Sequence, residues 1–543
     1  MNKSTFPIFL LILFSLPFGK GGGWVIAQNP LVKQWDYRFG GNDADYLYTL
    51  QQTTDGGYIL GGYSFSGISG DKTQPSWGVS DYWIVKTDSL GIKQWDKRFG
   101  GINSDGLYTL QQTSDGGYIL GGSSLSGIGG DKTQPSWGGH DYWIVKTDFL
   151  GNNQWDKRFG GINSDLLYSL HQTSDGGYIL GGYSLSGISG DKTQPSWGGP
   201  DYWIVKTDSV GNKQWDKRFG GAGDDALYSL RQTSDEGYIL GGYSISDSSG
   251  DKTQPSWGGN DYWIVKTDSL GIKQWDKRFG GTAIDWFYFL RQTSDGGYIL
   301  GGLSNSGIGG DKTQPSWGSL DYWIVKTDSL GIKQWDKNFG GTLEEEEFAN
   351  ITQTSDGGYL VAGTSQSPAS GDKTENNLGF EQTWIVKTDS AGNKQWDKTI
   401  ITTGQEEYGY AIQTNDECYA IAVFTGGGIG GYKTQASWGL YDYWIVKFCD
   451  TTITTGSPTL NPPQAEEGIA IAPNPFTDEL AVSIKRPGEK AELKIRDIYS
   501  RIIYSQKLLT VSCMLHTASW SNGIYFLEIV SEDGKMVSKI VKQ

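Results

Sequence analysis

The stretch DYWIVKTDSVGNKQWDKRF, residues 201–219, contains two runs of alternating apolar and polar residues joined by a short polar segment. Such alternation is typical of half-buried β-strands, and the Gly and Asn in the segment between them suit a tight hairpin. Two further strand-like runs, 167–173 and 178–184, precede this stretch and are joined by Ser174-Asp-Gly-Gly177. The four runs predict one antiparallel four-stranded unit.

This unit recurs along the chain. The tryptophan of the WIVK motif returns every 60 residues, with a single-residue insertion before the sixth copy. Its seven copies are Trp83, Trp143, Trp203, Trp263, Trp323, Trp384 and Trp444. Together with 80 glycines in 543 residues, this period predicts an all-β repeat array. We expect the strand tryptophans, both of WIVK and of the WD motif, to form the core between units.

The two ends of the array predict how it closes. It begins with a lone strand around Trp35 and finishes at the strand of Trp444, without the fourth strand of the last unit. If the first strand fills that place, every unit has four strands and no edge is left exposed. An open solenoid would need polar caps, which we do not find. We therefore predict a seven-bladed β-propeller over residues 28–452, with four-stranded blades and the N-terminal strand closing the last blade.

The order of motifs within a unit, as in Tyr178-Ile-Leu-Gly-Gly182 followed by Trp215, resembles the kelch-type β-propeller repeat. The unit is more similar still to the repeats with DGGY, WIVKTD and GN motifs that are common in exported bacterial proteins. This resemblance covers residues 34–450. It implies a propeller fold but little about function, because propellers serve as enzymes, lectins and scaffolds alike.

The N-terminus is typical of an export signal. Lys3 precedes an apolar run from Phe6 to Phe18, and Ala27 is a small residue suited to cleavage. We predict a signal peptide at 1–27 and no transmembrane segment after it. The net charge of −16 argues against nucleic acid as a partner, because phosphate contacts need clustered Lys and Arg.

The C-terminal part differs in composition. Residues 453–467 are rich in Thr, Pro and Gly and predict a linker, and short strand-like runs over 468–543 predict a small β-sandwich. Four ordered motifs, PNPF, IYSR, NGIY and the terminal KIVKQ, resemble the type A sorting domain of the type IX secretion system, with Ser500 where that family usually has Gly. The motif residues are Pro473, Asn474, Pro475, Phe476, Asn522, Gly523, Tyr525 and Lys542.

This resemblance implies the type IX secretion machinery as a partner, with export through the periplasm to the cell surface or the medium. An Ig-like adhesive module is the alternative for this domain.

The remaining candidates for chemistry are few. Cys418 begins a second strand and Cys449 ends a third strand of the last unit, so they either form a disulfide, leaving Cys513 free, or stay as thiols. The three histidines show no ligand-like spacing, and no nucleophile elbow, P-loop or dinucleotide fingerprint occurs. We therefore expect no metal, no cofactor and no catalytic residue.

A long connection between the second and third strands contains DKTQPSWG, which recurs unchanged five times. Its acidic residues are Asp71, Asp131, Asp191, Asp251 and Asp311. The tryptophans at its end are Trp77, Trp137, Trp197, Trp257, Trp317 and Trp438. A flat aromatic ring beside polar side chains can stack on a sugar, so these residues are candidate glycan contacts. The alternative is that the tryptophan packs over the edge of its blade.

A second acidic series stands before the first strand of each unit. Its members are Asp45, Asp105, Asp165, Asp225, Asp285, Glu346 and Glu406. These carboxylates either form a cation-attracting ring or accept backbone N–H groups at the start of a strand.

Taken together, these patterns favour an exported, non-enzymatic binding or adhesion propeller, with glycans as the ligand class. One alternative is a hydrolase or lyase acting on polysaccharide in the central channel, where Glu344, Glu345, Glu406 and Glu407 break the symmetry. Another is a purely structural surface protein. The near identity of the first five units favours repeated binding, because catalysis usually needs one asymmetric site.

Overall fold

The computed structural model describes residues 31–450, 469–472, 479–484, 492–497, 501–507, 512–517, 520, 523–531 and 534–542. The chain divides into two compact units, residues 1–452 and 453–543. The predicted signal peptide and linker lie outside the described residues. All described secondary structure is β, so this part of the chain offers no helix that could cross a membrane.

The first unit is built from four-stranded antiparallel sheets. Sheet 1 pairs β2 (Asp45–Gln52), β3 (Tyr58–Ser64), β4 (Asp81–Thr87) and β5 (Lys93–Phe99) in chain order. Five more sheets repeat this order. Sheet 2 contains β6 (Asp105–Gln112), β7 (Tyr118–Ser124), β8 (Asp141–Thr147) and β9 (Asn153–Phe159). Sheet 3 contains β10 (Asp165–Gln172), β11 (Tyr178–Ser184), β12 (Asp201–Thr207) and β13 (Lys213–Phe219). Sheet 4 contains β14 (Asp225–Gln232), β15 (Tyr238–Ser244), β16 (Asp261–Thr267) and β17 (Lys273–Phe279). Sheets 5 and 6 are β18 (Asp285–Gln292), β19 (Tyr298–Ser304), β20 (Asp321–Thr327), β21 (Lys333–Phe339); and β22 (Glu345–Gln353), β23 (Tyr359–Ser365), β24 (Gln382–Thr388), β25 (Lys394–Ile400).

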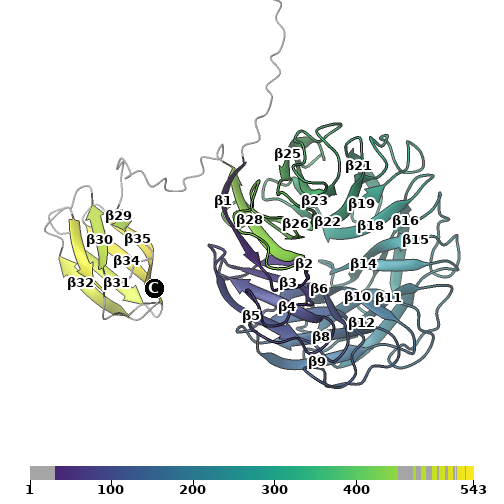
Figure 1. Cartoon of the computed structure of the whole chain (residues 1–543), viewed down its shortest axis with the longest axis horizontal. Coiled ribbons are helices and arrows are strands. Elements are labelled where there is room, and N and C mark those ends of the chain that lie inside the picture. The colour runs from purple at the N-terminus through teal and green to yellow at the C-terminus, as the bar shows by residue number, and fades with distance from the viewer. Residues whose placement is uncertain are drawn as a thin grey trace, which may run out of the picture. The chain divides into compact units, whose positions relative to one another are not determined.

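Sheet 7 draws on both ends of this unit. It contains β26 (Glu406–Gln413), β27 (Tyr419–Thr425) and β28 (Asp442–Asp450), and β1 (Leu31–Phe39) pairs antiparallel with β28 as its fourth strand. Figure 1 shows the sheets arranged around a common centre, with the first strand of each repeat innermost. Each sheet is open and has two edge strands. The fold is thus propeller-like, and the predicted use of the N-terminal strand agrees with this pairing.

The core lies between neighbouring sheets. The seven WIVK tryptophans are fully buried, as predicted. Trp83 Nε1 donates to Asp96 Oδ2 at 3.1 Å, so burial does not leave the indole N–H unpaired. The hydroxyl of Tyr82 donates to the carbonyl of Trp143 in the next sheet at 3.0 Å. The WD tryptophans, in contrast, are only half-buried, because they lie on the outer strand of each sheet, as Trp95 does on β5.

The described residues of the second unit form two antiparallel sheets. One has the order β29-β30-β33 and the other the order β32-β31-β34-β35. The strands are β29 (Ile469–Ala472), β30 (Glu479–Ile484), β31 (Glu492–Asp497), β32 (Ile502–Lys507), β33 (Ser512–His516), β34 (Gly523–Ser531) and β35 (Gly534–Lys542). Of the predicted sorting residues, Gly523 and Tyr525 lie on β34 and Lys542 ends β35. The remaining motif residues, Pro473 to Phe476 and Asn522, lie outside the described residues.

Candidate functional site

The lysine of the recurring loop is buried rather than presented to solvent. Lys72 Nζ donates to the carbonyl oxygen of Ser66 at 2.6 Å and to the hydroxyls of Ser64 and Ser76 at 3.0 and 3.1 Å. Burial lowers the pKa of Lys72, while the carboxylates of Asp45 and other nearby acids act in the opposite direction. This lysine therefore holds the loop together and is not free to bind a ligand.

The next loop residues bind the outer strand of their own sheet. Thr73 donates through N and Oγ1 to the carboxylate of Asp96, at 3.0 and 2.9 Å. The side-chain oxygen of Gln74 accepts from the backbone N–H of Arg98 at 2.7 Å. Burial would raise the pKa of Asp96, but hydrogen bonds from Lys93, Thr73 and Trp83 outweigh it and lower the pKa. The loop thus covers an edge strand that would otherwise offer free donors.

The tryptophan and the aspartate of the recurring loop join neighbouring sheets through an arginine. The guanidinium of Arg98 lies 4.9 Å from the ring centre of Trp77, and its Nη1 lies 2.6 Å from Asp131 Oδ2 in the loop of sheet 2. We call each such Trp, Arg and Asp set a loop clamp. The other loop clamps are Trp137/Arg158/Asp191, Trp197/Arg218/Asp251, Trp257/Arg278/Asp311 and Trp438/Arg38/Asp71. The last of these joins sheet 7 to sheet 1.

The glycine before the loop aspartate is explained by the same packing. Gly190 has φ of 55°, and a Cβ there would lie 2.3 Å from the carbonyl oxygen of Gly160 and 3.1 Å from Cδ1 of Trp137. Only glycine combines this left-handed backbone with so close an approach.

The loop tryptophans nevertheless remain accessible. The six side chains are 52–58% exposed, and in the five loop clamps the guanidinium covers only part of the tryptophan ring. The predicted packing role and a surface for stacking are therefore compatible. The loop aspartates are mostly engaged in ion pairs with arginine, which leaves the tryptophan rings as the accessible part of this predicted site.

The second acidic series does not form a surface ring. Asp45 is fully buried, and its Oδ2 accepts from Gly41 N at 2.7 Å and from Ser66 Oγ at 3.1 Å. In sheet 6 the corresponding place is taken by Glu345, which pairs with Ser365 as Asp45 pairs with Ser64, and not by Glu346. The series therefore closes turns at the start of strands. The predicted position in sheet 6 was wrong by one residue, because the pairing of β22 with β23 is irregular.

The diverged repeats bring several glutamates together. Glu345 and Glu406 are buried at the structural aspartate position, so neither is an accessible catalytic group. Burial, with Glu346 and other carboxylates nearby, raises the pKa of Glu381 to about 9, and burial raises the pKa of Glu347 to about 8. Burial and the charge of Glu346 also raise the pKa of Glu407. In the part of the chain that the structure describes, no group of three or more His, Cys, Asp or Glu is placed to hold a metal ion.

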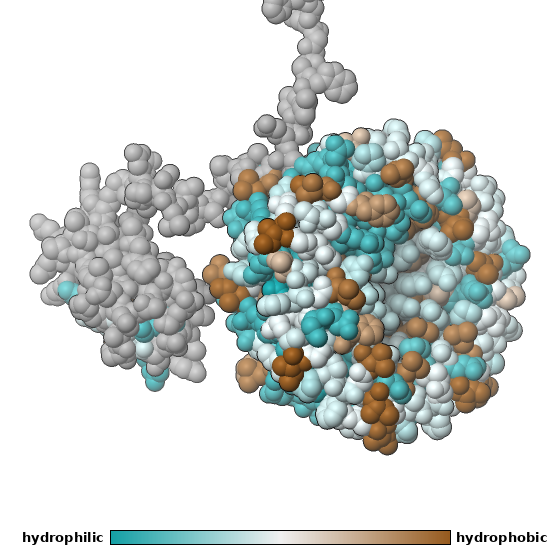
Figure 2. Space-filling view, viewed as in Figure 1, coloured by the Kyte–Doolittle hydropathy of each residue, from teal (hydrophilic) through white to brown (hydrophobic). Residues whose placement is uncertain are grey.

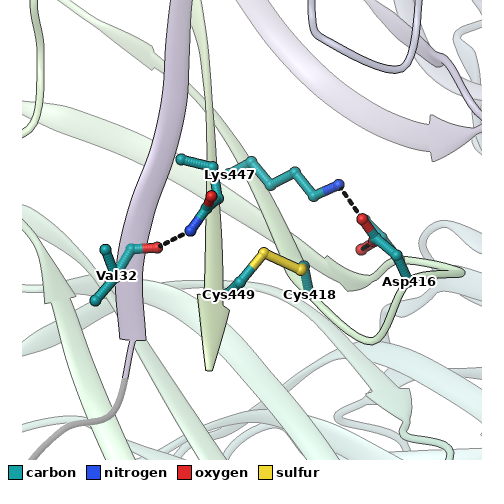
Figure 3. Close-up of a disulfide and its surroundings, with 7 residues drawn as sticks. Val32, Asp416, Cys418, Lys447 and Cys449 are labelled. Atoms are coloured by element: carbon teal, nitrogen blue, oxygen red, sulfur yellow. Dashed lines mark hydrogen bonds and ion pairs between the residues drawn. A yellow bond between two sulfur atoms is a disulfide. The ribbon is translucent and has the colours of Figure 1, made fainter. Parts of the chain in front are cut away.

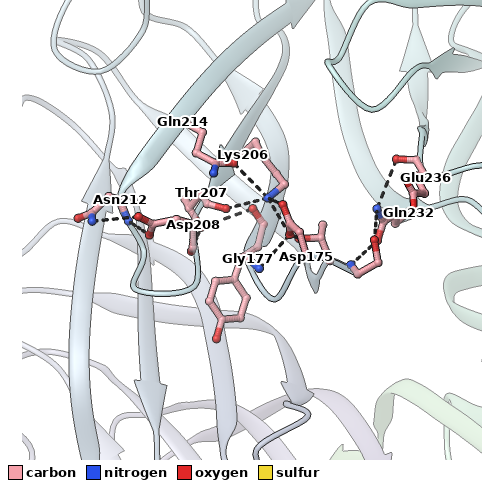
Figure 4. Close-up of polar contacts among 12 residues, drawn as sticks. Asp175, Gly177, Lys206, Thr207, Asp208, Asn212, Gln214, Gln232 and Glu236 are labelled. Atoms are coloured by element: carbon pink, nitrogen blue, oxygen red, sulfur yellow. Dashed lines mark hydrogen bonds and ion pairs between the residues drawn. The ribbon is translucent and has the colours of Figure 1, made fainter.

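At the ends of the sheets away from the long loops, hydrogen bonds hold the short hairpin turns, as Figure 4 shows for sheet 3. Asp175 accepts from Lys206 Nζ at 2.8 Å, from Thr173 Oγ1 at 2.5 Å and from Gly177 N at 3.0 Å. Burial opposes ionisation here, but these donors lower the pKa of Asp175 to about 2. The carboxylate of Asp175 therefore stabilises this turn.

Figure 3 shows the disulfide between Cys418 and Cys449, which joins the start of β27 to the end of β28. Val32 of β1 is the register partner of Cys449. Beside the disulfide, Lys447 Nζ lies 2.6 Å from Asp416 Oδ2. The pairing considered from the sequence is thus present where the terminal strand joins sheet 7.

The sequence reasoning missed a central cavity of about 620 Å³. Figure 2 shows one face of the first unit, hollowed near its centre. The walls include tyrosines from the first strands: Tyr48, Tyr108, Tyr168, Tyr228, Tyr288 and Tyr408. A tyrosine recurs every 60 residues at five of these positions, from Tyr48 to Tyr288, and could have indicated the cavity, but the sequence analysis treats it only as part of a strand.

Comparisons with known proteins identify the second unit. Residues 470–543 match the family model described as secretion system C-terminal sorting domain. The chain therefore carries a type IX sorting domain, which implies an interaction with that secretion machinery and export to the cell surface or the medium.

The other similarities of this chain to known proteins are weaker. The regulatory protein FlaEY of Caulobacter vibrioides is 30% identical over 164 residues, which are 28% of this chain and 17% of that protein, so the chain spans less than a fifth of its length. PorZ, a surface component of the type IX secretion system of Porphyromonas gingivalis, has 11% identity and a TM-score of 0.37, with 93% of this chain and 60% of that chain covered. The WD40 domain of Neurospora crassa Pan2 has 10% identity and a TM-score of 0.41, with 75% and 89% covered. Likeness at this level carries no conclusion about activity.

Proposed function

We propose that this chain is an exported, non-catalytic surface or secreted binding protein, delivered by type IX secretion. The observation that carries this proposal is the sorting domain at residues 470–543. The signal peptide at 1–27 and the linker at 453–467 complete the proposed domain order. The apolar residues Leu493, Leu527 and Leu515, buried on the two sheets of the second unit, support a small β-sandwich there.

In this proposal the first unit, which contains the seven repeats, is a closed seven-bladed propeller. Three contacts between sheet 7 and sheet 1 support closure. The hydroxyl of Tyr443 donates to the carbonyl of Trp83 at 3.1 Å, Asp45 N donates to the carbonyl of Tyr441 at 2.8 Å, and the Arg38 loop clamp spans the same joint. In such a ring each sheet keeps only short edges at its inner and outer strands, and the loop covers the outer edge, as Thr73 and Gln74 do on β5. The kelch-type resemblance stays a prediction.

Glycans are the ligand class that we propose for the loop face. The support is the set of six loop tryptophans, each more than half exposed and five of them held by an arginine. An aromatic ring fixed in this way loses little conformational entropy when the C–H face of a sugar stacks on it. Equivalent sites around one ring also increase avidity, by about 10²-fold or more where one polysaccharide spans two of them.

A polysaccharide hydrolase or lyase is the second candidate, and the glutamate cluster of sheets 6 and 7 favours it. A carboxyl group with a pKa near 8, such as Glu347, is protonated at neutral pH and has the form that a general acid needs. Release of reducing ends from polysaccharide by the wild type, lost in Glu347→Gln, would establish this activity and contradict the non-catalytic proposal.

Export is tested by expressing the full chain and a chain ending at residue 469 in a bacterium with type IX secretion. We expect the full chain in the surface or medium fraction and the shortened chain in the periplasm. Delivery of both chains to the surface would contradict the proposed role of the sorting domain.

Glycan binding is tested on an array with the full chain and a variant in which the six loop tryptophans are alanine. The matched control replaces the exposed loop isoleucines Ile68, Ile128, Ile188 and Ile308 by alanine. Loss of binding in the tryptophan variant alone, with circular dichroism unchanged, supports the proposal. No binding by the wild type leaves the structural surface protein as the better description.

A further inference from the structure

At one position that lines the central cavity, the residue type differs between repeats that are otherwise near copies. The seventh residue of the first strand is Gln51 in β2 and Gln111 in β6, and the side-chain oxygens of both accept from backbone N–H groups of the next sheet, at 2.8 and 2.9 Å. In the next three sheets this residue is His171, Arg231 and Arg291. Sheets that are otherwise near copies therefore differ at a residue that lines the cavity.

The two arginines have no carboxylate partner among the described residues. Arg231 Nη1 donates to the carbonyl oxygen of Leu230 at 2.8 Å and contacts His171 Nε2, whereas the buried Nε atoms of Arg231 and Arg291 have no hydrogen-bond partner. None of the described residues that line the cavity is Asp or Glu. In a chain of net charge −16, two unpaired guanidinium groups in one cavity are an exception that sequence composition does not explain.

The guanidinium groups are held in position by an aromatic ring. Phe289 lies beside both, with its ring centre 5.4 Å from Cζ of Arg231 and 5.3 Å from Cζ of Arg291. Burial and the charge of Arg291 lower the pKa of Arg231 to about 9, so it stays a cation at neutral pH. Burial and both arginines lower the pKa of His171, which keeps the imidazole neutral. The charge of this group is thus positive, and no described residue provides a counter-ion for it.

The rest of the cavity provides walls for the body of a ligand. Tyrosines from neighbouring sheets surround the space, and burial raises the pKa of Tyr108 and Tyr288 to about 12, so their hydroxyls remain hydrogen-bond donors. A volume of about 620 Å³ lies in the range of small-molecule sites. Planar guanidinium groups suit carboxylate, sulfate and phosphate oxygens, because two parallel N–H groups can donate to two oxygens.

We propose that the central cavity binds a small anionic ligand of about one or two sugar rings, whose oxyanion group pairs with Arg231 and Arg291. The tyrosines contact the body of the ligand. This site is separate from the loop tryptophans, so it does not depend on the proposed function.

The test is isothermal titration calorimetry on the full chain with glucuronate, glucose 6-sulfate and glucose 6-phosphate, and with glucose as the neutral control. We expect at least one of the anions to bind and glucose not to bind. The preferred anion identifies whether a carboxylate, sulfate or phosphate is the natural group. Absence of binding by all three anions at millimolar concentration overturns the proposal.

The matched variants use residues that the repeat already accepts. Arg231→Gln and Arg291→Gln place at these positions the residue found at Gln51 and Gln111, so the fold is expected to tolerate them. We expect each change to weaken anion binding about 10-fold or more, because a charge-assisted hydrogen bond is lost. Lys157→Gln, which removes one positive charge from the outer strand β9, should leave binding unchanged. Equal binding by the double glutamine variant and the wild type overturns the proposal, whereas retention of anion binding by the six-tryptophan variant supports a separate site.

Discussion

The joint between sheets 2 and 3 and the joint between sheets 6 and 7 perform the same task with different residues. The first has a loop clamp of Trp137, Arg158 and Asp191. At the second joint all three members are replaced, by Leu378, Thr399 and Tyr432.

The intermediate joint, between sheets 5 and 6, has lost only the arginine. Asn338 stands in its place, and Trp317 Nε1 donates directly to Asp372 Oδ2 at 2.8 Å. At the joint between sheets 6 and 7, Lys398 lies over the ring of Tyr432 and pairs with Glu375 at 2.9 Å. The comparison teaches that the loop tryptophan can bond the next aspartate directly when the arginine is lost, and that a different cation–aromatic contact and ion pair connect the sheets when all three residues are replaced.

The largest effect is expected from the core, where both regions are alike. Trp203→Ala and Trp384→Ala each remove a fully buried indole and should lower the free energy of unfolding by about 3–5 kcal/mol. Each also leaves the carboxylate of Asp216 or Asp397 without one donor. Denaturant titration of both variants should give similar losses, and a small loss for Trp384→Ala alone would show that sheet 6 packs less firmly than its burial indicates.

A second prediction concerns the sheet that includes both ends of the unit. Cys418→Ala with Cys449→Ala removes a disulfide between residues 31 apart and should cost about 3 kcal/mol, because the unfolded chain regains freedom. The measurement is the midpoint of unfolding with and without reductant. Reductant should lower the midpoint of the wild type and leave that of the variant unchanged, and an unaffected wild type would contradict the expectation.

A third prediction compares the clamped and unclamped joints directly. Arg158→Ala should cost about 1–2 kcal/mol, because it removes a stacked guanidinium and a partly exposed ion pair. Building a loop clamp at the joint of sheets 6 and 7, with Leu378→Trp, Thr399→Arg and Tyr432→Asp together, should stabilise the unit by a smaller amount, up to about 1 kcal/mol. Matched Tm measurements test both changes, and destabilisation by the triple variant would show that this joint has adapted to its own residues.

The last prediction concerns the pH dependence of stability. Burial raises the pKa of Asp165 to about 6, above its unfolded value near 3.8. As pH falls from about 6 to 4, the folded state therefore binds a proton before the unfolded state does, and the folded state becomes more stable relative to the unfolded state. Asp175, with its pKa lowered to about 2, contributes stability above pH 4 that is lost as pH falls toward 2. In the diverged sheets burial raises the pKa of Glu345 and Glu406 to about 8, so their gain on acidification begins near pH 8.

Tm should therefore increase from pH 8 to about pH 5 and fall below pH 4. Asp165→Asn should reduce the increase between pH 6 and 4, and Glu406→Gln should reduce it between pH 8 and 5. A Tm that decreases steadily from pH 8 downward would contradict the assignment of these buried acids.

Much of the fold could be predicted from the chain itself. The period of the WIVK tryptophan and the missing fourth strand of the last repeat were enough to predict four-stranded sheets with β1 beside β28, because alternation and turn residues are local signals. The sorting motifs were equally readable, since they are short and ordered. The site was harder. Asp71 and Trp77 were visible as a conserved pair of loop residues, but their partners, Arg38 and Arg98, belong to other strands.

The sequence by itself determined the repeat, its strands and turns, and the sorting domain, because each depends on residues close together in the chain. Only the tertiary structure decided what the conserved residues do. It places Arg98 between a tryptophan of its own sheet and an aspartate of the next, buries Asp45, and brings Arg231 and Arg291 into one cavity, although they are 60 residues apart. The physical reason is that charge pairing and burial act between neighbours in space, and these neighbours are set by how the sheets pack around their common centre.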